Sequence, residues 1–314
     1  YKRRLITRSM EALASNTELS VDDLHAQLAE IMDKVSQAGN SRYESGTDYT
    51  KQFDSFMAGE AILPAEARDN LVCFGLPTVD DTVVANAGRL VVLGAMPSCG
   101  KTALAIQAAI RTAQRGQRVI MASLEMDADE IASRIVACLF EVNSKIAMRR
   151  GVAPDPRRAK EIEAIKKNLV GLHGCSGDSW HSIEAAITRE YRKHKASVAI
   201  VDYLQLMNGT PRKGETEASM IGEITKGAKR LAQKLGICVI LVSQFNREVK
   251  EGQEPTLQNL LGSGQIERDA DVALLLWNDS TNFDPRGDRP INVRVAKNRA
   301  GERNDKFTLT FRAS

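Results

Sequence analysis

The segment 91–109, VVLGAMPSCGKTALAIQAA, constrains the fold of this chain more than any other stretch. An apolar run typical of a buried strand breaks into a short turn of small residues, and a helix pattern follows directly after Gly100-Lys101-Thr102. This order of strand, turn and helix is that of a P-loop, in which backbone N–H groups and the positive end of the helix hold a polyphosphate. The segment therefore predicts a phosphate-binding turn between a strand and a helix.

The residue types in this turn fit that chemistry. Lys101 is placed to reach the β- and γ-phosphates of a nucleotide, and the Thr102 hydroxyl is placed to ligate Mg²⁺. Ala95 stands where the motif usually has its first glycine, so the alternative is a chance Gly-Lys-Thr in an ordinary strand–helix turn. The flanking pattern favours the P-loop, and we expect the chain to bind and hydrolyse a nucleoside triphosphate with Mg²⁺. The residues expected around the phosphates are Pro97, Ser98, Cys99, Gly100, Lys101 and Thr102.

Composition excludes several other classes of protein. The 314 residues are 43% hydrophobic, which is enough for one large core and an appendage. No apolar run approaches the roughly 18 residues of a membrane span, so no membrane association is expected. The five cysteines are widely spaced without a CxxC pair, which argues against a zinc site or disulfide framework and fits a cytoplasmic location. The net charge is only +3, so any nucleic-acid site has to be a local patch.

The pattern from about residue 72 onward predicts an α/β fold with a largely parallel central sheet, because short apolar runs alternate with amphipathic helices. Strands are expected at 89–95, 118–123, 198–203, 237–243, 272–277, 291–297 and 306–311. Helices are expected at 101–115, 127–140, 157–168, 181–194 and 217–235. The loop 298–305 is rich in Asn and Gly, which predicts a hairpin between the last two strands.

The N-terminal part is expected to be a separate element. We predict a helical linker region over 1–52 and an ATPase motor domain over 53–314. Within the linker, the helix pattern of 20–35 gathers its apolar residues on one stripe, which needs a surface to cover it. That surface belongs either to the same domain or to a neighbouring subunit, and the sequence leaves both open.

Polar residues stand at the ends of several predicted strands. Asp202 ends an apolar strand and is expected to hold the Mg²⁺ shell, because hard cations prefer oxygen ligands; alone, it fits a turn or cap residue equally well. Glu125 follows strand 118–123, where a carboxylate can act as general base on the attacking water. The alternative for Glu125 is a first-turn glutamate favoured by the helix dipole. Gln244 ends strand 237–243 and is expected to contact the γ-phosphate or that water.

Two cations and two long loops complete the candidate residues. Lys297 and Arg299 occupy alternate positions at a strand end and therefore point to the same side. Cations supplied across a subunit boundary stabilise a transferring phosphoryl group, although a solvated basic turn has the same pattern. The loops 207–217 and 245–265 carry candidate phosphate contacts to nucleic acid, while their acidic residues fit an ordinary solvated surface equally well. These candidates are Arg212, Lys213 and Lys250. The aromatic fraction of 5% argues against base stacking.

The motifs AMPSCGKT, SLEM, VDYLQLM, SQFNRE, GSGQIERDAD and AKNRAGE occur in this order, and the set resembles the RecA-like C-terminal ATPase domain of DnaB-type replicative helicases over most of 70–314. The resemblance implies that Glu125 is the general base, Asp202 the Walker B carboxylate and Gln244 the γ-phosphate sensor. It further implies that Lys297 and Arg299 reach the ATP of the neighbouring protomer.

The resemblance also sets expectations for partners. The opening YKRRLI and the helix 20–35 look like the family's linker, whose helix docks on the adjacent subunit of a hexameric ring. The family's DNA loop commonly reads Arg-Glu-Ser-Gly, where this chain has Leu261-Gly262-Ser263-Gly264, so the backbone N–H groups of Gly262 and Gly264 are expected to contact DNA. The globular N-terminal domain that recruits primase is missing from the sequence, so primase binding is not expected. A helicase loader is a candidate partner.

The sequence thus favours a hexameric, ATP-driven DNA helicase motor that translocates on single-stranded DNA in the family's 5′→3′ direction. One alternative is a RecA-like recombinase or filament protein, in which ATP controls assembly on DNA. The linker helix, and the lack of an evident N-terminal polymerisation strand, weigh against that alternative. Another is a regulatory ATPase that does not contact nucleic acid.

Overall fold

The computed structural model describes residues 71–96, 99–153, 155–173, 179–202, 217–246, 249, 253–260, 263–279, 288–301 and 305–312. All of them belong to one compact unit, 69–314. The predicted linker 1–52, with its helix 20–35 and its boundary to the motor domain, lies outside the described residues and stays a prediction.

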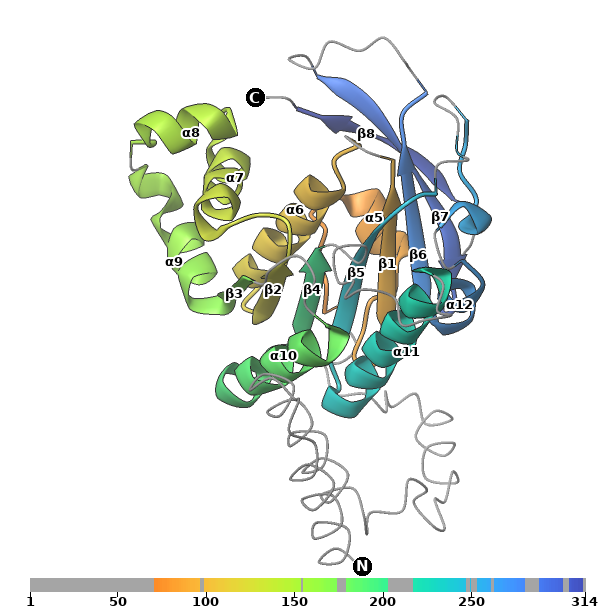
Figure 1. Ribbon diagram of the computed structural model, residues 1–314. Helices are drawn as coiled ribbons and strands as arrows, with labels where there is room; N and C mark the ends of the chain where they lie inside the picture. The colour runs from red at the N-terminus through yellow and green to blue at the C-terminus, as the bar shows by residue number, and fades with distance from the viewer. Residues whose placement is uncertain are drawn as a thin grey trace, which may run out of the picture. The chain divides into compact units, whose positions relative to one another are not determined.

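An eight-stranded sheet runs through this unit in the order β3-β2-β4-β5-β1-β6-β7-β8 (Figure 1). The strands from β3 to β6 in this order are parallel to their neighbours, whereas β7 and β8 are antiparallel. The parallel strands β1, β2, β4, β5 and β6 are buried along nearly their whole length, as expected when helices cover both faces of a sheet. The strands span β1 Leu90–Ala95, β2 Val119–Ser123, β3 Leu169–His173, β4 Val198–Asp202, β5 Cys238–Gln244, β6 Val272–Trp277, β7 Arg289–Asn298 and β8 Lys306–Phe311.

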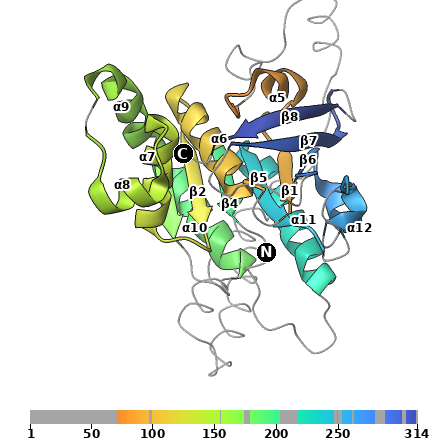
Figure 2. The same cartoon turned by 90° about the horizontal axis from the view of Figure 1, so that it is seen from above.

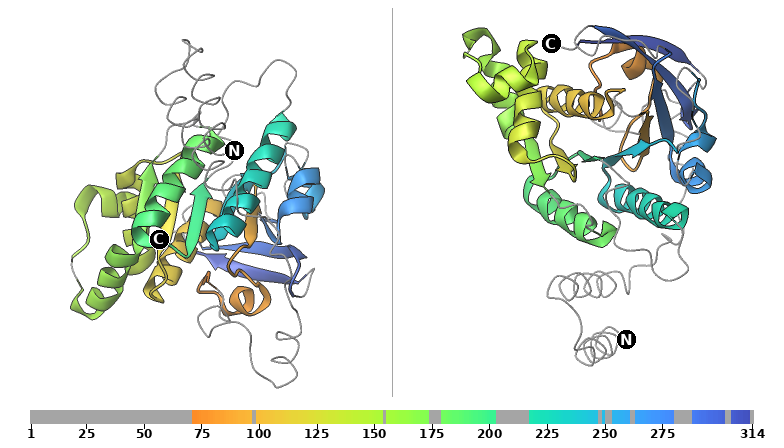
Figure 3. Two further views of the ribbon diagram at one scale, coloured as in Figure 1. Left: turned by 90° about the horizontal axis from the view of Figure 1, so that it is seen from below. Right: turned by 45° about the horizontal axis from the view of Figure 1, so that its top comes forward.

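Helices cover the two faces of the sheet as separate layers (Figures 2 and 3). One core cluster joins Val91 and Leu93 of β1 to Ile106 and Ile110 of α6, and α5, α7 and α9 add to the same side. The other joins the alternate β1 residues to α10, α11 and α12, which follows from the two-residue period of a strand. The helices are α5 Pro77–Thr82, α6 Lys101–Gln114, α7 Ala128–Phe140, α8 Ser144–Arg150, α9 Ala159–Asn168, α10 Trp180–His194, α11 Glu217–Leu235 and α12 Ser263–Asp269, with 3₁₀ turns η1 Pro156–Arg158 and η3 Leu257–Asn259.

Local sequence explains how the main helices begin. Asp127 accepts a hydrogen bond from the Glu130 N–H at the start of α7, and Ser179 does the same for the Ser182 N–H at the start of α10. Such side chains satisfy N–H groups that have no partner inside the helix. α6 has no side-chain cap, and it begins instead at Gly100 in the left-handed region with φ 78°. The first turn of α6 is therefore the P-loop turn itself.

The predicted α/β fold and parallel sheet are confirmed, and the strands and helices predicted from residue 89 onward are present with small shifts of their ends. The β7–β8 hairpin is also confirmed. The sequence-based prediction missed β3, α5 and α8, and it was wrong to treat all of 245–265 as loop, because η3 and the start of α12 lie within it. β3 was missed because it is a short, partly exposed edge strand that follows α9 without a loop. α12 forms because Ile266 and Ala270 bury one side of a short helix that packs on α11.

The close packing of α10 on α11 leads to a stability prediction. A Cβ on Gly227 of α11 would lie 2.2 Å from Nε1 of Trp180. Alanine normally stabilises a helix by about 1 kcal/mol relative to glycine. Overpacking costs about 1–3 kcal/mol. We therefore expect Gly227→Ala to lower the free energy of unfolding in urea titrations, and this loss to shrink in a Trp180→Leu background. A Gly227→Ala variant more stable than its parent would contradict the packing.

Candidate functional site

Four of the predicted site residues, Lys101, Glu125, Asp202 and Gln244, meet at one edge of the sheet, where the parallel strands end. β1 ends at Ala95, which pairs with Gln244 at the end of β5. β4 ends at Asp202, which pairs with Ser123 at the end of β2. The turn into α6 and the segment with Glu125 leave from this same edge, so residues far apart in the sequence converge on one place. We refer to it as the nucleotide edge.

The turn before α6 lies close to the Phe311 side chain of β8. Gly100 has φ 78°, and a Cβ there would come 3.0 Å from the Phe311 ring of β8. The residue therefore has to be glycine both for its backbone conformation and for the space it leaves. A cavity of about 370 Å³ adjoins the turn and is lined in part by Cys99, Gly100 and Phe311. Of the remaining loop residues, Pro97 and Ser98 lie outside the described residues.

Lys101 is the buried cation of the nucleotide edge. Its Nζ lies 3.6 Å from Oε2 of Glu125 and 3.9 Å from Oδ1 of Asp202. Burial lowers the pKa of Lys101, while the charges of Asp202 and Glu125 act in the opposite direction. The two carboxylates hold the desolvated Lys101 ammonium in position. A phosphate placed next to this ammonium would attract it strongly, because Coulomb attraction is large where little water screens it.

Asp202 is the most buried member of the group, with 1% of its side chain exposed. Burial raises the pKa of Asp202 above its usual value, and the nearby Lys101 ammonium and Thr102 hydroxyl lower it again in part. Among the described residues, neither carboxylate oxygen has a hydrogen bond of full geometry. Buried carboxylate oxygens with few hydrogen bonds, next to the Thr102 hydroxyl, suit Mg²⁺, because Mg²⁺ prefers hard oxygen ligands and keeps several waters. Thr102 and Asp202 are thus the residues that would hold the ion.

Glu125 and Gln244 lie at the same edge as Lys101, as predicted. Glu125 is about half exposed and precedes Asp127, which caps α7, so it is not a first-turn residue of that helix. The first-turn alternative for Glu125 is therefore wrong, since a residue ahead of the cap has another role than stabilising the helix dipole. Gln244 is the partly exposed last residue of β5, beside Ala95.

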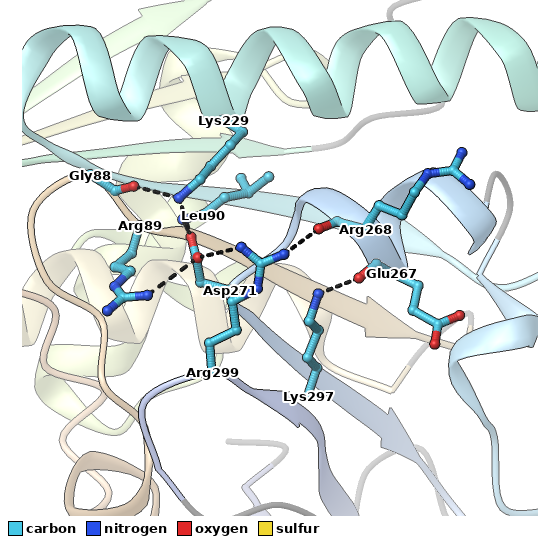
Figure 4. Close-up of polar contacts among 9 residues, drawn as sticks. All are labelled: Gly88, Arg89, Leu90, Lys229, Glu267, Arg268, Asp271, Lys297 and Arg299. Atoms are coloured by element: carbon cyan, nitrogen blue, oxygen red, sulfur yellow. Dashed lines mark hydrogen bonds and ion pairs between the residues drawn. The ribbon is translucent and has the colours of Figure 1, made fainter. Parts of the chain in front are cut away.

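Lys297 and Arg299 lie at the opposite edge of the sheet. Lys297 pairs with Ala273 at the start of β6, and the Arg299 N–H donates to the carbonyl of Asp271, which precedes that strand. Both side chains point the same way, as predicted: Lys297 donates to the carbonyl of Glu267 and Arg299 to that of Arg268, in the last turn of α12 (Figure 4). Cations at the C-terminal end of a helix satisfy carbonyls that have no intrahelical partner.

A buried carboxylate that the sequence-based prediction did not single out holds this second edge together. Asp271 accepts hydrogen bonds from Lys229 Nζ at 2.6 Å and from the Leu90 N–H at 2.8 Å. It also accepts from Arg89 at 3.3 Å and from Arg299 at 3.4 Å (Figure 4). The signal was available in the motif GSGQIERDAD, since an aspartate between buried alanine and valine requires polar partners inside the fold.

The predicted nucleic-acid contacts are mostly outside the described residues, namely Arg212, Lys213, Lys250 and Gly262. Gly264 is described: it is an exposed residue of the first turn of α12, and not part of a loop as expected. This corrects the predicted conformation of Gly264, because Ile266 brings the segment into a helix against α11. The role of all five residues stays a prediction.

Fold and nucleotide edge together define a P-loop NTPase of the RecA-like class. A family model described as "DnaB-like helicase C terminal domain" matches residues 75–314. The match covers more than half of the chain and includes both edges of the sheet, so the chain belongs to the DnaB-like helicase C-terminal domain family.

Individual relatives agree with this assignment. The chain is 30% identical over 305 residues to the replicative DNA helicase DnaB of Rickettsia conorii, covering 88% of this chain and 60% of that protein. It is 32% identical over 315 residues to a probable plasmid replicative DNA helicase of Chlamydia psittaci, covering 93% of this chain and 67% of that protein. This chain thus spans about 60% of the Rickettsia relative's length.

Solved structures share the fold. One that is described as an ATPase domain superposes with a TM-score of 0.66 at 26% identity, covering 85% of this chain and 95% of that domain. A DnaB-like replicative helicase studied with its primase interactions gives a TM-score of 0.70 at 23% identity, over 98% of this chain and 73% of that one. Among the described residues, none of the helices has the length and hydrophobicity that crossing a membrane requires.

The two buried aspartates predict opposite effects on stability. The pKa of Asp202 is raised in the folded chain, so its contribution to stability is present at low pH and is lost as pH rises through that pKa. We expect nucleotide-free Asp202→Asn, which keeps Glu125 as a partner for Lys101, to melt at or above the parent's temperature at about pH 8. This difference should close as the pH falls.

Asp271 is the matched control. Burial by itself raises its pKa, but hydrogen bonds from Lys229 and the Leu90 N–H, with nearby cations, bring it below the usual value. Its stabilisation is therefore present above the unfolded pKa and is lost as pH falls through the folded pKa. Asp271→Asn should lower the melting temperature at about pH 8, and less so in acid. Equal destabilisation by the two substitutions would contradict the assignment of Asp202 as a ligand-binding carboxylate.

Proposed function

We propose that this chain is the ATP-hydrolysing motor of a hexameric replicative DNA helicase, which translocates on single-stranded DNA in the 5′→3′ direction of its family. The observation that carries the proposal is the separation of the catalytic groups. The P-loop, Glu125, Asp202 and Gln244 lie at one edge of the sheet, and Lys297 and Arg299 at the other. The names of the relatives as replicative helicases support the same function.

The length of β1 keeps Arg299 too far from the P-loop of its own chain to reach a nucleotide bound there. Asp271, which contacts Arg299, bonds to Leu90 at the start of β1, whereas the P-loop turn follows Ala95 at its end. At about 3.3 Å per residue the strand spans roughly 16 Å, more than an arginine side chain reaches. Arg299 therefore serves a nucleotide held by another copy of the chain. A closed ring gives every copy such a neighbour.

The residues of the nucleotide edge divide the work of hydrolysis between them. Lys101 and the backbone N–H groups of the turn bind the β- and γ-phosphates, and Gln244 orients the γ-phosphate or the attacking water. Glu125 accepts a proton from that water as its oxygen bonds to the γ-phosphorus and the bond to ADP breaks. Mg²⁺, held through Thr102 and Asp202, would neutralise charge on the phosphates. Lys297 and Arg299 of the next copy stabilise the negative charge of the transferring group.

Contacts to DNA complete the proposal. Arg212, Lys213 and Lys250, with the backbone at Gly262 and Gly264, would bind phosphates of a single strand, so that recognition depends little on base sequence. The low aromatic content supports phosphate contact over base stacking. Further copies of the chain and a helicase loader are the protein partners in this proposal.

Glu125→Gln separates binding from hydrolysis. Glutamine keeps the size of the side chain and most of its hydrogen bonds but cannot accept the proton, so steady-state ATP turnover should fall by about 100-fold or more. Binding of a fluorescent ATP analogue should stay within a few-fold of the parent, whereas Lys101→Ala should weaken it because the β/γ-phosphate contact is lost.

The control for this variant is Glu163→Gln on α9, which removes the same charge from a solvent-exposed pair with Lys166. Its turnover should equal that of the parent. If Glu125→Gln retains more than half of the parent's turnover, the general base is another group.

Mixing two inactive variants tests the site shared between copies. Arg299→Ala keeps its own P-loop, and Lys101→Ala keeps its cations for the neighbour. Mixed rings therefore contain interfaces that pair an intact P-loop with an intact Arg299, and the mixture should regain ATPase activity that neither variant has alone. Absence of any gain, when labelled subunits demonstrably exchange, argues against a shared site.

The recombinase alternative also places a site between copies, so imaging has to separate the two. Negative-stain images with DNA and an ATP analogue show closed rings for the helicase and open filaments for a strand-exchange protein. ATP turnover unaffected by single-stranded DNA would instead favour the regulatory ATPase.

A further inference from the structure

Asp271 and its donors form a closed network at the edge that carries Arg299 (Figure 4). The carboxylate is 2% exposed and is surrounded by three cations, Arg89, Lys229 and Arg299. Backbone bonds tie the same residue to its neighbours, because the Asp271 N–H donates to the Leu90 carbonyl at 2.8 Å. The network thus joins the start of β1, α11 and the strand end after β7.

Arg299 is tethered at both ends by this network. Its backbone N–H donates to the Asp271 carbonyl at 2.9 Å, its Nη1 lies 3.4 Å from the Asp271 carboxylate, and its Nη2 donates to the Arg268 carbonyl. The side chain is nevertheless 43% exposed. A guanidinium has five N–H donors, so these bonds leave others for a phosphate. These contacts hold the guanidinium in place while much of the Arg299 side chain remains accessible to solvent.

We propose that Asp271 is a positioning residue, which orients the Arg299 guanidinium for the nucleotide of the neighbouring protomer. This inference rests on the proposed function, in which Arg299 acts across the subunit boundary. A free arginine side chain has to lose much of its rotamer freedom before it stabilises a transition state. The buried carboxylate removes that cost in advance, because Arg299 is already held when the neighbour's ATP arrives.

Asp271→Asn breaks this contact selectively. The strongest bonds of the carboxylate, from Lys229 and the Leu90 N–H, go to Oδ2, while Arg89 and Arg299 share Oδ1. The asparagine oxygen is expected to stay with the strong donors, so that its NH₂ group faces both guanidinium groups. Two donors then meet where a charge-assisted bond was, and Arg299 loses its anchor.

The test measures ATP turnover of the full chain below its melting temperature. We expect Asp271→Asn to lower kcat by about 10- to 100-fold with KM for ATP within a few-fold of the parent, because the neighbour's own P-loop is untouched. The matched control is Arg89→Gln, which removes another donor to the same Oδ1 but no contact of Arg299, and it should leave kcat within about twofold.

Two further measurements separate positioning from a merely structural role. Mixing Asp271→Asn with Lys101→Ala should restore activity, because the intact Arg299 of one variant serves the intact P-loop of the other; a folding defect is not complemented in this way. The double variant Asp271→Asn/Arg299→Ala should be no slower than Arg299→Ala alone, since Asp271 acts through Arg299. If Asp271→Asn does not fold, Asp271→Glu, which keeps the anion but displaces it by a methylene group, replaces it in every assay with the same expectations.

The outcomes distinguish this inference from the proposed function. If Arg299→Ala is inactive and complemented by Lys101→Ala while the Asp271 variant keeps the parent's kcat, positioning by Asp271 is wrong and the shared site stands. Failed complementation of the Asp271 variant, or an additional loss in the double variant, also overturns the inference. If Arg299→Ala itself keeps full activity, the proposed function fails first.

Discussion

The central strand β1 is the constraint on which the arrangement of both edges of the sheet depends. It lies between β5 and β6, hydrogen-bonded to both, and no residue of the strand is exposed. Its end leads into the P-loop turn, and its start at Leu90 bonds to Asp271. Because a paired, buried strand is stiff, the distance between the phosphate-binding turn and the Arg299 anchor is set by the sheet.

The two buried aspartates show how one fold uses the same side chain in opposite ways. Asp202 is buried with few hydrogen-bond partners, so its pKa is raised and its charge opposes folding. Asp271 is equally buried, but several donors satisfy it, so its pKa is lowered and its charge stabilises the fold. Burial desolvates both carboxylates, and the number of donors around each decides the direction. The aspartate with few donors, Asp202, lies at the nucleotide edge, and the aspartate with several donors, Asp271, lies at the opposite edge.

The helix α12 links the supporting edge to the segment where DNA contact is proposed. Its first turn contains Gly264, and the carbonyls of its last turn accept hydrogen bonds from Lys297 and Arg299. A short helix of this kind is weakly stable on its own, so its packing on α11 and its capping by these cations maintain it. The sequence-based prediction took the segment for loop because its glycines and its brevity hide the helical period. Only the burial of Ile266 and Ala270 against a distant helix reveals it.

The sequence by itself determined most of the elements and which residues gather at the nucleotide edge. The strand-turn-helix order of the P-loop, and the polar residues that end apolar strands, depend on local patterns and on the rule that parallel strands end at one edge. It also placed Lys297 and Arg299 on one side of a strand end. Only the tertiary structure decided that these cations lie at the opposite edge, that Asp271 anchors one of them, and that α12 is a helix. Each of these depends on contacts between segments distant in sequence, such as Leu90 with Asp271, and local periodicity carries no information about such contacts.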